Sequence, residues 1–105
     1  MKEQLISLAK QRGFKSDHID MDFFIEKKGE IFEYWFYLWM CELQKFLREK
    51  KDIDVIVTPE YNSDGYSYYL YKNKEEMFSV HSSRNVYESE LEKALIDGLN
   101  LKLIK

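Results

Sequence analysis

The most regular alternation of apolar and polar residues lies between residues 31 and 50, which read IFEYWFYLWMCELQKFLREK. At about 100° per residue, eight of the apolar side chains fall within one arc of about 140°. They are Phe32, Trp35, Phe36, Trp39, Met40, Leu43, Phe46 and Leu47. Charged and amide side chains occupy the opposite arc. The pattern predicts a long amphipathic helix whose apolar arc packs on the core.

Four further apolar residues of this helix lie among its charged positions: Tyr34, Tyr37, Leu38 and Cys41. The first half of the helix is therefore apolar nearly all round, and something must cover this second face. We expect the chain's own N-terminal segment to cover it. The alternative is a partner protein.

The N-terminal segment, residues 1–30, begins with a predicted helix at residues 2–12. Gly13 is well placed as its C-terminal cap, and Phe14 as the hydrophobic contact that follows such a cap. Residues 15–30 are interpreted as a short strand or an extended covering segment.

Three strands and two turns are predicted in the second half of the chain. The β-branched run at residues 53–58 is typical of a strand, and Pro59 should end its pairing. Turn residues at 62–65 lead into a strand at 66–72, and a turn at Asn73 and Lys74 leads into a strand at 76–82. Two consecutive hairpins predict an antiparallel meander.

A final helix is indicated by Asn85 and Glu88, which have the spacing of a capping box. Its apolar stripe comprises Leu91, Ala94, Leu95, Gly98 and Leu99. Gly98 should mark a close approach to a neighbouring element. The chain is therefore predicted to be a single α+β domain spanning residues 1–105. In it, a core of order α-β-β-β-α (residues 31–105) has a three-stranded antiparallel sheet packed against two long helices.

Composition narrows the possible functions. The formal net charge is −3, whereas dedicated nucleic-acid binders are usually basic. A single cysteine in 105 residues predicts a reduced, cytoplasmic setting. No signal peptide or membrane span is predicted.

From residue 31 onward, the predicted order of helix, three strands and helix resembles the double-stranded RNA-binding domain. That family grips phosphate with lysines at the start of its last helix and enters the minor groove with a loop containing Pro and His. Here the last helix begins with Tyr87, Glu88 and Glu90, and Arg84 is the basic residue nearby. The resemblance implies RNA binding as an alternative function.

A second resemblance rests on three stretches of the amino-acid sequence: YLWMCELQKFLR from Tyr37, YESELEKAL from Tyr87, and the Gly13-Phe14 pair. These stretches are similar to small uncharacterised phage and prophage proteins. The resemblance implies an accessory protein that binds a host factor and modulates or inhibits it. Defence nucleases such as CRISPR effectors are one class of target.

Chemistry-bearing motifs are few. No Gly-rich phosphate loop, Cys-x-x-Cys or Gly-x-Ser-x-Gly is present. His18, Asp20 and Asp22 with distant His81 are the one combination with metal-ligating residue types, and an acidic surface strand is the favoured interpretation of them. No enzyme activity, cofactor or metal is predicted.

Tyrosines are the main candidates for contact with a partner. Tyr66 and Tyr68 should share one face of the second strand, and Tyr69 and Tyr71 the other. The outer pair could bind a protein or stack on bases, or it could simply stabilise a solvated sheet. Carboxylates of the last helix, Glu88, Glu90, Glu92 and Asp97, are interpreted as solvated, with phosphate mimicry as the alternative.

These observations predict a non-catalytic protein-binding module whose partner is a host protein. RNA binding is the alternative function, and a homodimer is compatible with either. The candidate contact residues are Tyr34, Tyr37, Leu38, Tyr66, Tyr68, Tyr69, Tyr71 and Arg84.

Overall fold

The computed structural model describes residues 2–19, 33–59, 65–81 and 87–101. In chain order the elements are α1 (Lys2–Gln11), α3 (Glu33–Lys50), β1 (Ile53–Pro59), β2 (Tyr66–Lys72), β3 (Glu75–His81) and α4 (Tyr87–Leu99). The strands of these segments form one antiparallel sheet of order β1-β2-β3. The predicted α+β class and element order are confirmed. The predicted cover at residues 20–30, the Asn85 cap and Arg84 lie outside the described residues.

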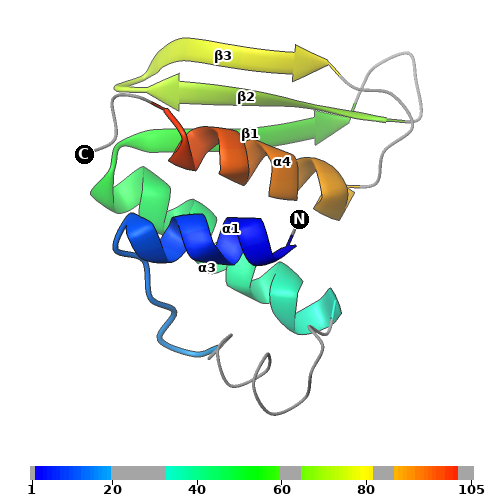
Figure 1. Ribbon diagram of the computed structural model, residues 1–105. Coiled ribbons are helices and arrows are strands. Elements are labelled where there is room, and N and C mark those ends of the chain that lie inside the picture. Colours follow the sequence, from blue (N-terminus) through cyan, green and yellow to red (C-terminus); the bar gives the residue numbers. More distant parts are fainter. Residues whose placement is uncertain (1, 20–32, 60–64, 82–86, 102–105) are drawn as a thin grey trace.

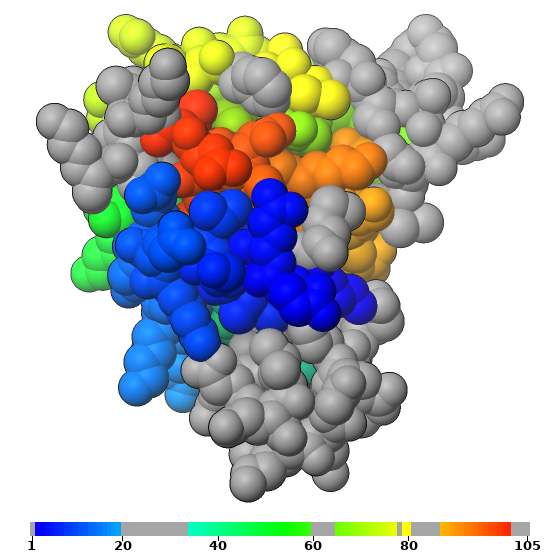
Figure 2. Space-filling view, viewed as in Figure 1, coloured from blue at the N-terminus to red at the C-terminus, as the bar shows by residue number. Residues whose placement is uncertain are grey.

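The helices lie on one face of the sheet (Figure 1). α4 packs across β1 and β2, and α3 packs beside it against β1. α1 packs on α4 and lies farther from the sheet than the other two helices. In the space-filling view α1, in blue, lies directly against α4, in orange and red (Figure 2). α4 is therefore covered by the sheet on one side and by α1 on the other.

This enclosure buries α4 further than its apolar stripe predicts. Leu91, Ala94, Leu95 and Leu99 are buried as expected, but Glu90 is 0% exposed and Glu92 is 7% exposed. The prediction that the carboxylates of this helix are solvated is wrong for these two residues, because α4 is covered on two sides. The buried Glu90 carboxylate forms an ion pair with Lys93, in which Lys93 Nζ lies 3.2 Å from Glu90 Oε1.

Gly13 ends α1 as predicted. Its φ of +88° is the left-handed conformation that glycine adopts without steric cost. The Gly13 N–H donates to the Lys10 carbonyl at 3.0 Å, and the Phe14 N–H donates to the Ala9 carbonyl at 3.0 Å. These two bonds form a Schellman cap. The cap turns the chain so that Phe14 follows α1 directly into contact with α3.

Phe14 fixes which side of α3 the N-terminal segment covers. Its ring lies 5.5 Å from that of Trp39 and 5.2 Å from that of Phe46, between centroids. Lys2 Nζ lies 5.4 Å from the centroid of the Phe36 ring. Residues 2–19 therefore pack on the predicted core arc of α3 and on α4. The expectation that the N-terminal segment covers the face of Tyr34 is wrong for residues 2–19, and residues 20–30 of that segment lie outside the described residues.

The core arc of α3 is otherwise close to its prediction. Phe36, Trp39, Met40, Leu43 and Leu47 are buried. Phe32 lies outside the described residues, Phe46 is half-buried, and the exposed exception is Trp35, at 42%. It lies at the edge of the arc, so the elements packed on the arc's centre do not cover it.

The sheet has a covered face and an open face. Antiparallel pairing aligns Val55 with Leu70 and Val57 with Tyr68, on the side where the helices pack. Ile56 pairs with Tyr69 on the opposite side. As predicted, Tyr66 and Tyr68 share one face and Tyr69 and Tyr71 the other.

Two local features shape β3. Asn73 and Lys74 both have positive φ, 53° and 68°, in the predicted two-residue turn. The pairing of β2 with β3 then shifts between Leu70 and Tyr71, because Leu70 pairs with Phe78 and Tyr71 with Glu76. This places a bulge at Met77, which the sequence pattern did not predict.

Gly98 lies at the predicted close approach. A Cβ built there would lie 3.4 Å from Val55 Cγ2 and 3.6 Å from Leu47 Cδ1. α4 therefore meets both β1 and α3 at this glycine.

No helix in the described ranges is both long enough and apolar enough to cross a membrane.

Candidate interaction surface

Aromatic side chains gather where the first half of α3 meets the beginnings of β2 and α4. We use the name aromatic face for two groups of contacting rings, which are Tyr34 with Trp35, and Tyr37 with Tyr87 and Tyr66. Tyr34 is 66% exposed, the most of any large hydrophobic residue described. Its ring lies 5.5 Å from that of Trp35. Tyr37 is one turn further along α3, so it lies beside Tyr34 on the helix surface.

Three of these rings form a tyrosine cluster: Tyr37, Tyr66 and Tyr87. The ring of Tyr87, at the start of α4, lies 6.3 Å from that of Tyr37 and 5.6 Å from that of Tyr66. The interplanar angles are 67° and 75°, so both contacts are edge-to-face. All three side chains are half-buried, with one side against the protein. The sequence did not reveal this convergence, since Tyr87 was identified only as a helix-start residue.

The tyrosine cluster has an acidic neighbour. A hydrogen bond with Cys41 is the main cause that raises the pKa of Tyr37, and the charge of Glu88 adds to it. Burial is the main cause that raises the pKa of Tyr87, and Cys41 and Glu88 add to it. Glu88 itself is exposed. Its carboxylate thus acts electrostatically on two of the three rings while remaining open to solvent.

Other predicted contact residues lie elsewhere. Leu38 is half-buried and packs against the core cluster. Tyr69 and Tyr71 are half-buried on the open face of the sheet, where Ile56, the pairing partner of Tyr69, is 41% exposed. That face also carries Thr58, which is half-buried, and its pairing partner Ser67, which is only 2% exposed, so this face is neither uniformly aromatic nor uniformly open. The structure therefore separates the predicted tyrosines into two surfaces.

Tyr68 belongs to neither surface, because it is only 3% exposed beneath α4. Its hydroxyl donates a hydrogen bond to Asp97 Oδ2 of α4. Burial is the main cause that raises the pKa of Tyr68, and the bond to Asp97 and the charge of Glu90 add to it. Tyr68 joins the sheet to α4 and is not available for partner contact.

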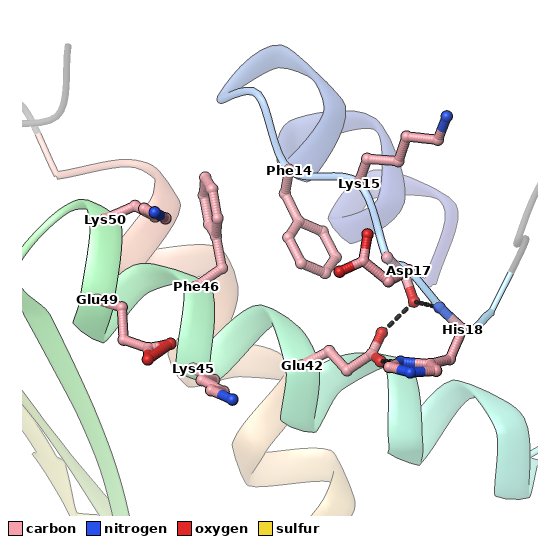
Figure 3. A pocket seen from close by; sticks show the side chains of 10 residues that line it. Phe14, Lys15, Asp17, His18, Glu42, Lys45, Phe46, Glu49 and Lys50 are labelled. Atoms are coloured by element: carbon pink, nitrogen blue, oxygen red, sulfur yellow. Dashed lines mark hydrogen bonds and ion pairs between the residues drawn. The ribbon is translucent and has the colours of Figure 1, made fainter.

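An open groove of about 330 Å³ lies between residues 14–18 and the second half of α3 (Figure 3). Phe14 and Phe46 provide its apolar part, and charged residues of both signs surround them. They are Lys15, Asp17, His18, Glu42, Lys45, Glu49 and Lys50. This groove was not predicted, because it forms only when the Schellman cap directs Phe14 onto α3.

One side of the groove is closed by hydrogen bonds to Glu42. The Ser16 hydroxyl donates to Glu42 Oε2, and His18 Nδ1 lies 2.6 Å from Glu42 Oε1. The Ser16 oxygen also accepts the backbone N–H groups of His18 and Ile19, at 3.2 and 2.9 Å. These bonds fasten the chain after α1 to the middle of α3.

The hydrogen bonds among Ser16, His18 and Glu42 connect the three side chains in a different order from those of a hydrolytic triad. In a triad the histidine lies between the hydroxyl and the carboxylate, so that it can take the hydroxyl proton. Here Glu42 lies between the other two residues, and the His18 side chain is 80% exposed. The described residues also contain no cluster of three His, Cys, Asp or Glu side chains suited to a metal ion. Asp20 and Asp22 lie outside those residues.

The start of α4 is acidic where the RNA-binding resemblance would require cations. Its first turn carries Glu88, which is exposed, and Glu90, which is buried and paired with Lys93. Comparison of the chain with protein-family models, with curated proteins and with solved structures gave no match.

Proposed function

We propose that the protein is a non-catalytic binding module that contacts another protein through its aromatic face. The observation that carries the proposal is the exposure of Tyr34, at 66%, beside Trp35, at 42%. Tyr and Trp are enriched among the residues that contribute most to protein–protein binding, because they bury much area and lose little conformational entropy. The tyrosine cluster extends this surface from α3 to α4.

Charge favours a basic partner surface. The chain carries a net charge of −3, and Glu88 lies exposed beside the tyrosine cluster. Complementary charge around an aromatic centre accelerates association and selects among partners. The proposed occupant of the aromatic face is therefore a protein that presents Lys or Arg side chains.

The resemblance to phage accessory proteins supports a host factor as the partner. In that class a stoichiometric complex is sufficient to disable a target, so no catalytic centre is required. A host nuclease has a basic nucleic-acid groove and would meet the charge requirement. This part of the proposal rests on the resemblance and on net charge.

RNA binding is the alternative, and the element order α-β-β-β-α favours it. The exposed carboxylate of Glu88 in the first turn of α4 opposes it, since it would lie near phosphate. The dependence of binding affinity on salt concentration distinguishes the two functions. Phosphate contacts weaken steeply with salt, whereas an aromatic protein interface depends on it less.

The test is affinity capture from a host lysate, with nuclease treatment and a salt series, using the wild-type chain and matched variants. Tyr34→Ala should lower the affinity for the captured protein about 30-fold if Tyr34 is a hot spot worth about 2 kcal/mol. Tyr71→Ala is the matched control, because it removes a tyrosine from the open sheet face.

Three results would contradict the proposal. RNA recovered in place of protein, and lost at high salt, would restore the alternative. A captured protein that is lost with Tyr71→Ala but kept with Tyr34→Ala would move the interface to the sheet. Equal affinity of both variants and the wild type would remove the aromatic face from the interface.

A further inference from the structure

The tyrosine cluster has ring faces that no cation of the described chain occupies. The two cation–π contacts within the described residues lie elsewhere, at Lys2 with Phe36 and Lys51 with Phe46. Each edge-to-face contact in the cluster uses one face of one ring. Two such contacts join the three rings, and each of the three half-buried side chains keeps part of its surface exposed to solvent.

A cation is the ligand that suits these rings. The face of a tyrosine ring is the negative end of its quadrupole, and rings at steep angles let one cation meet more than one ring. Glu88, which follows Tyr87 directly in the first turn of α4 and is exposed, adds a negative charge at this end of the helix. The N-terminus of α4 contributes about half a positive charge, and the acidic residues Glu88 and Glu90 of the first turn offset it.

We propose that Tyr37, Tyr66, Tyr87 and Glu88 form a binding site for an arginine side chain of the partner protein. This inference rests on the proposed protein-binding function and specifies the chemistry of its centre. A guanidinium group fits better than an ammonium group, because its plane stacks on a tyrosine ring while its edge donates to a carboxylate. Glu88 accepts those hydrogen bonds, and Tyr37 and Tyr87 provide the ring faces.

The direct test titrates the full chain with N-acetyl-arginine amide and follows the tyrosine ring signals by NMR with ¹³C-labelled tyrosine. Saturable shifts are expected at Tyr37, Tyr66 and Tyr87, and none at Tyr71 on the open sheet face. N-acetyl-citrulline amide has the same shape without the charge. It should bind about tenfold more weakly, because the cation–π and ion-pair contributions are lost.

Two variants test the residues. Glu88→Gln should weaken binding of the arginine probe about three- to tenfold, and Glu49→Gln, an exposed glutamate at the groove on α3, should leave it unchanged. Tyr87→Leu should weaken binding by at least as much as Glu88→Gln, because it removes the central ring. Since Glu88 is exposed, its substitution keeps the test valid even where Tyr87→Leu unfolds the protein.

Several outcomes would overturn the inference. They are equal binding of the citrulline and arginine probes, equal shifts at Tyr71, and an unchanged affinity in Glu88→Gln. If the probe fails while Tyr34→Ala still abolishes capture of a protein partner, the binding function stands and the arginine site falls. If the capture shows no dependence on Tyr34 either, the proposed function falls as well.

Discussion

The hydrogen bond between Tyr68 and Asp97 gives a prediction whose size and pH dependence both follow from the structure. Tyr68 is nearly fully buried on β2, and its hydroxyl donates to the half-buried carboxylate of Asp97 on α4. Tyr68→Phe keeps the ring and removes the donor. A hydrogen bond to a charged group contributes about 1.5–3 kcal/mol, so we expect the free energy of unfolding at about pH 7 to fall by that amount.

The pH dependence has a definite sign. The pKa of Tyr68 is raised in the folded protein, so the folded state holds this proton more tightly than the unfolded state. The resulting stability is fully present below the ordinary tyrosine pKa of about 10 and is lost as the pH rises toward the folded value. Above about pH 10 the wild type should therefore lose up to about 1.4 kcal/mol per pH unit relative to Tyr68→Phe.

Urea unfolding followed by circular dichroism at about pH 7 and about pH 11 measures both effects. The other tyrosines titrate in both proteins, so the difference between the two isolates Tyr68. Asp97→Asn and the double variant complete a cycle, and the coupling energy should exceed about 0.5 kcal/mol. A loss below about 0.5 kcal/mol at neutral pH, or a difference that does not shrink at alkaline pH, would refute the reasoning.

Two further substitutions test the packing. Phe14→Ala should lower the free energy of unfolding by about 3–5 kcal/mol, because Phe14 is buried against Trp39 and Phe46; a loss under about 1 kcal/mol in urea unfolding would mean that this contact is absent. Gly98→Ala should raise it by about 0.5–1 kcal/mol, because a methyl group there meets Val55 and Leu47 at ordinary contact distance and alanine favours the helix. A fall in the melting temperature of Gly98→Ala would show that α4 lies too close to β1 for a side chain.

Local signals in the sequence predicted most of the elements. The period of 3.6 residues identified α3 and α4, and the period of two separated Tyr68 from Tyr69 on β2. Gly13 and Phe14 predicted the end of α1 because a Schellman cap is made within six residues. Each of these features is determined by neighbours along the chain.

Features that depend on distant segments were not predicted. The burial of Glu90 and Glu92 requires α1 and the sheet to enclose α4, and nothing within α4 indicates that. The tyrosine cluster likewise joins residues from α3, β2 and α4. The one available sign was Tyr87, an aromatic residue at the first position of a helix that otherwise begins with acidic residues.

The exposure of Tyr34 follows from where residues 2–19 pack, which is against Trp39 and Phe46 of α3 and against α4. The Schellman cap and the bonds of Ser16 and His18 to Glu42 hold residues 13–19 on the side of α3 that carries Trp39 and Phe46. α1 is therefore directed onto α4, where it covers an otherwise exposed side of that helix. Residues 2–19 cannot cover both α4 and the face of Tyr34, since the cap fixes their direction. Among the described residues, the exposure of Tyr34 at the start of α3 is thus a consequence of how α1 ends.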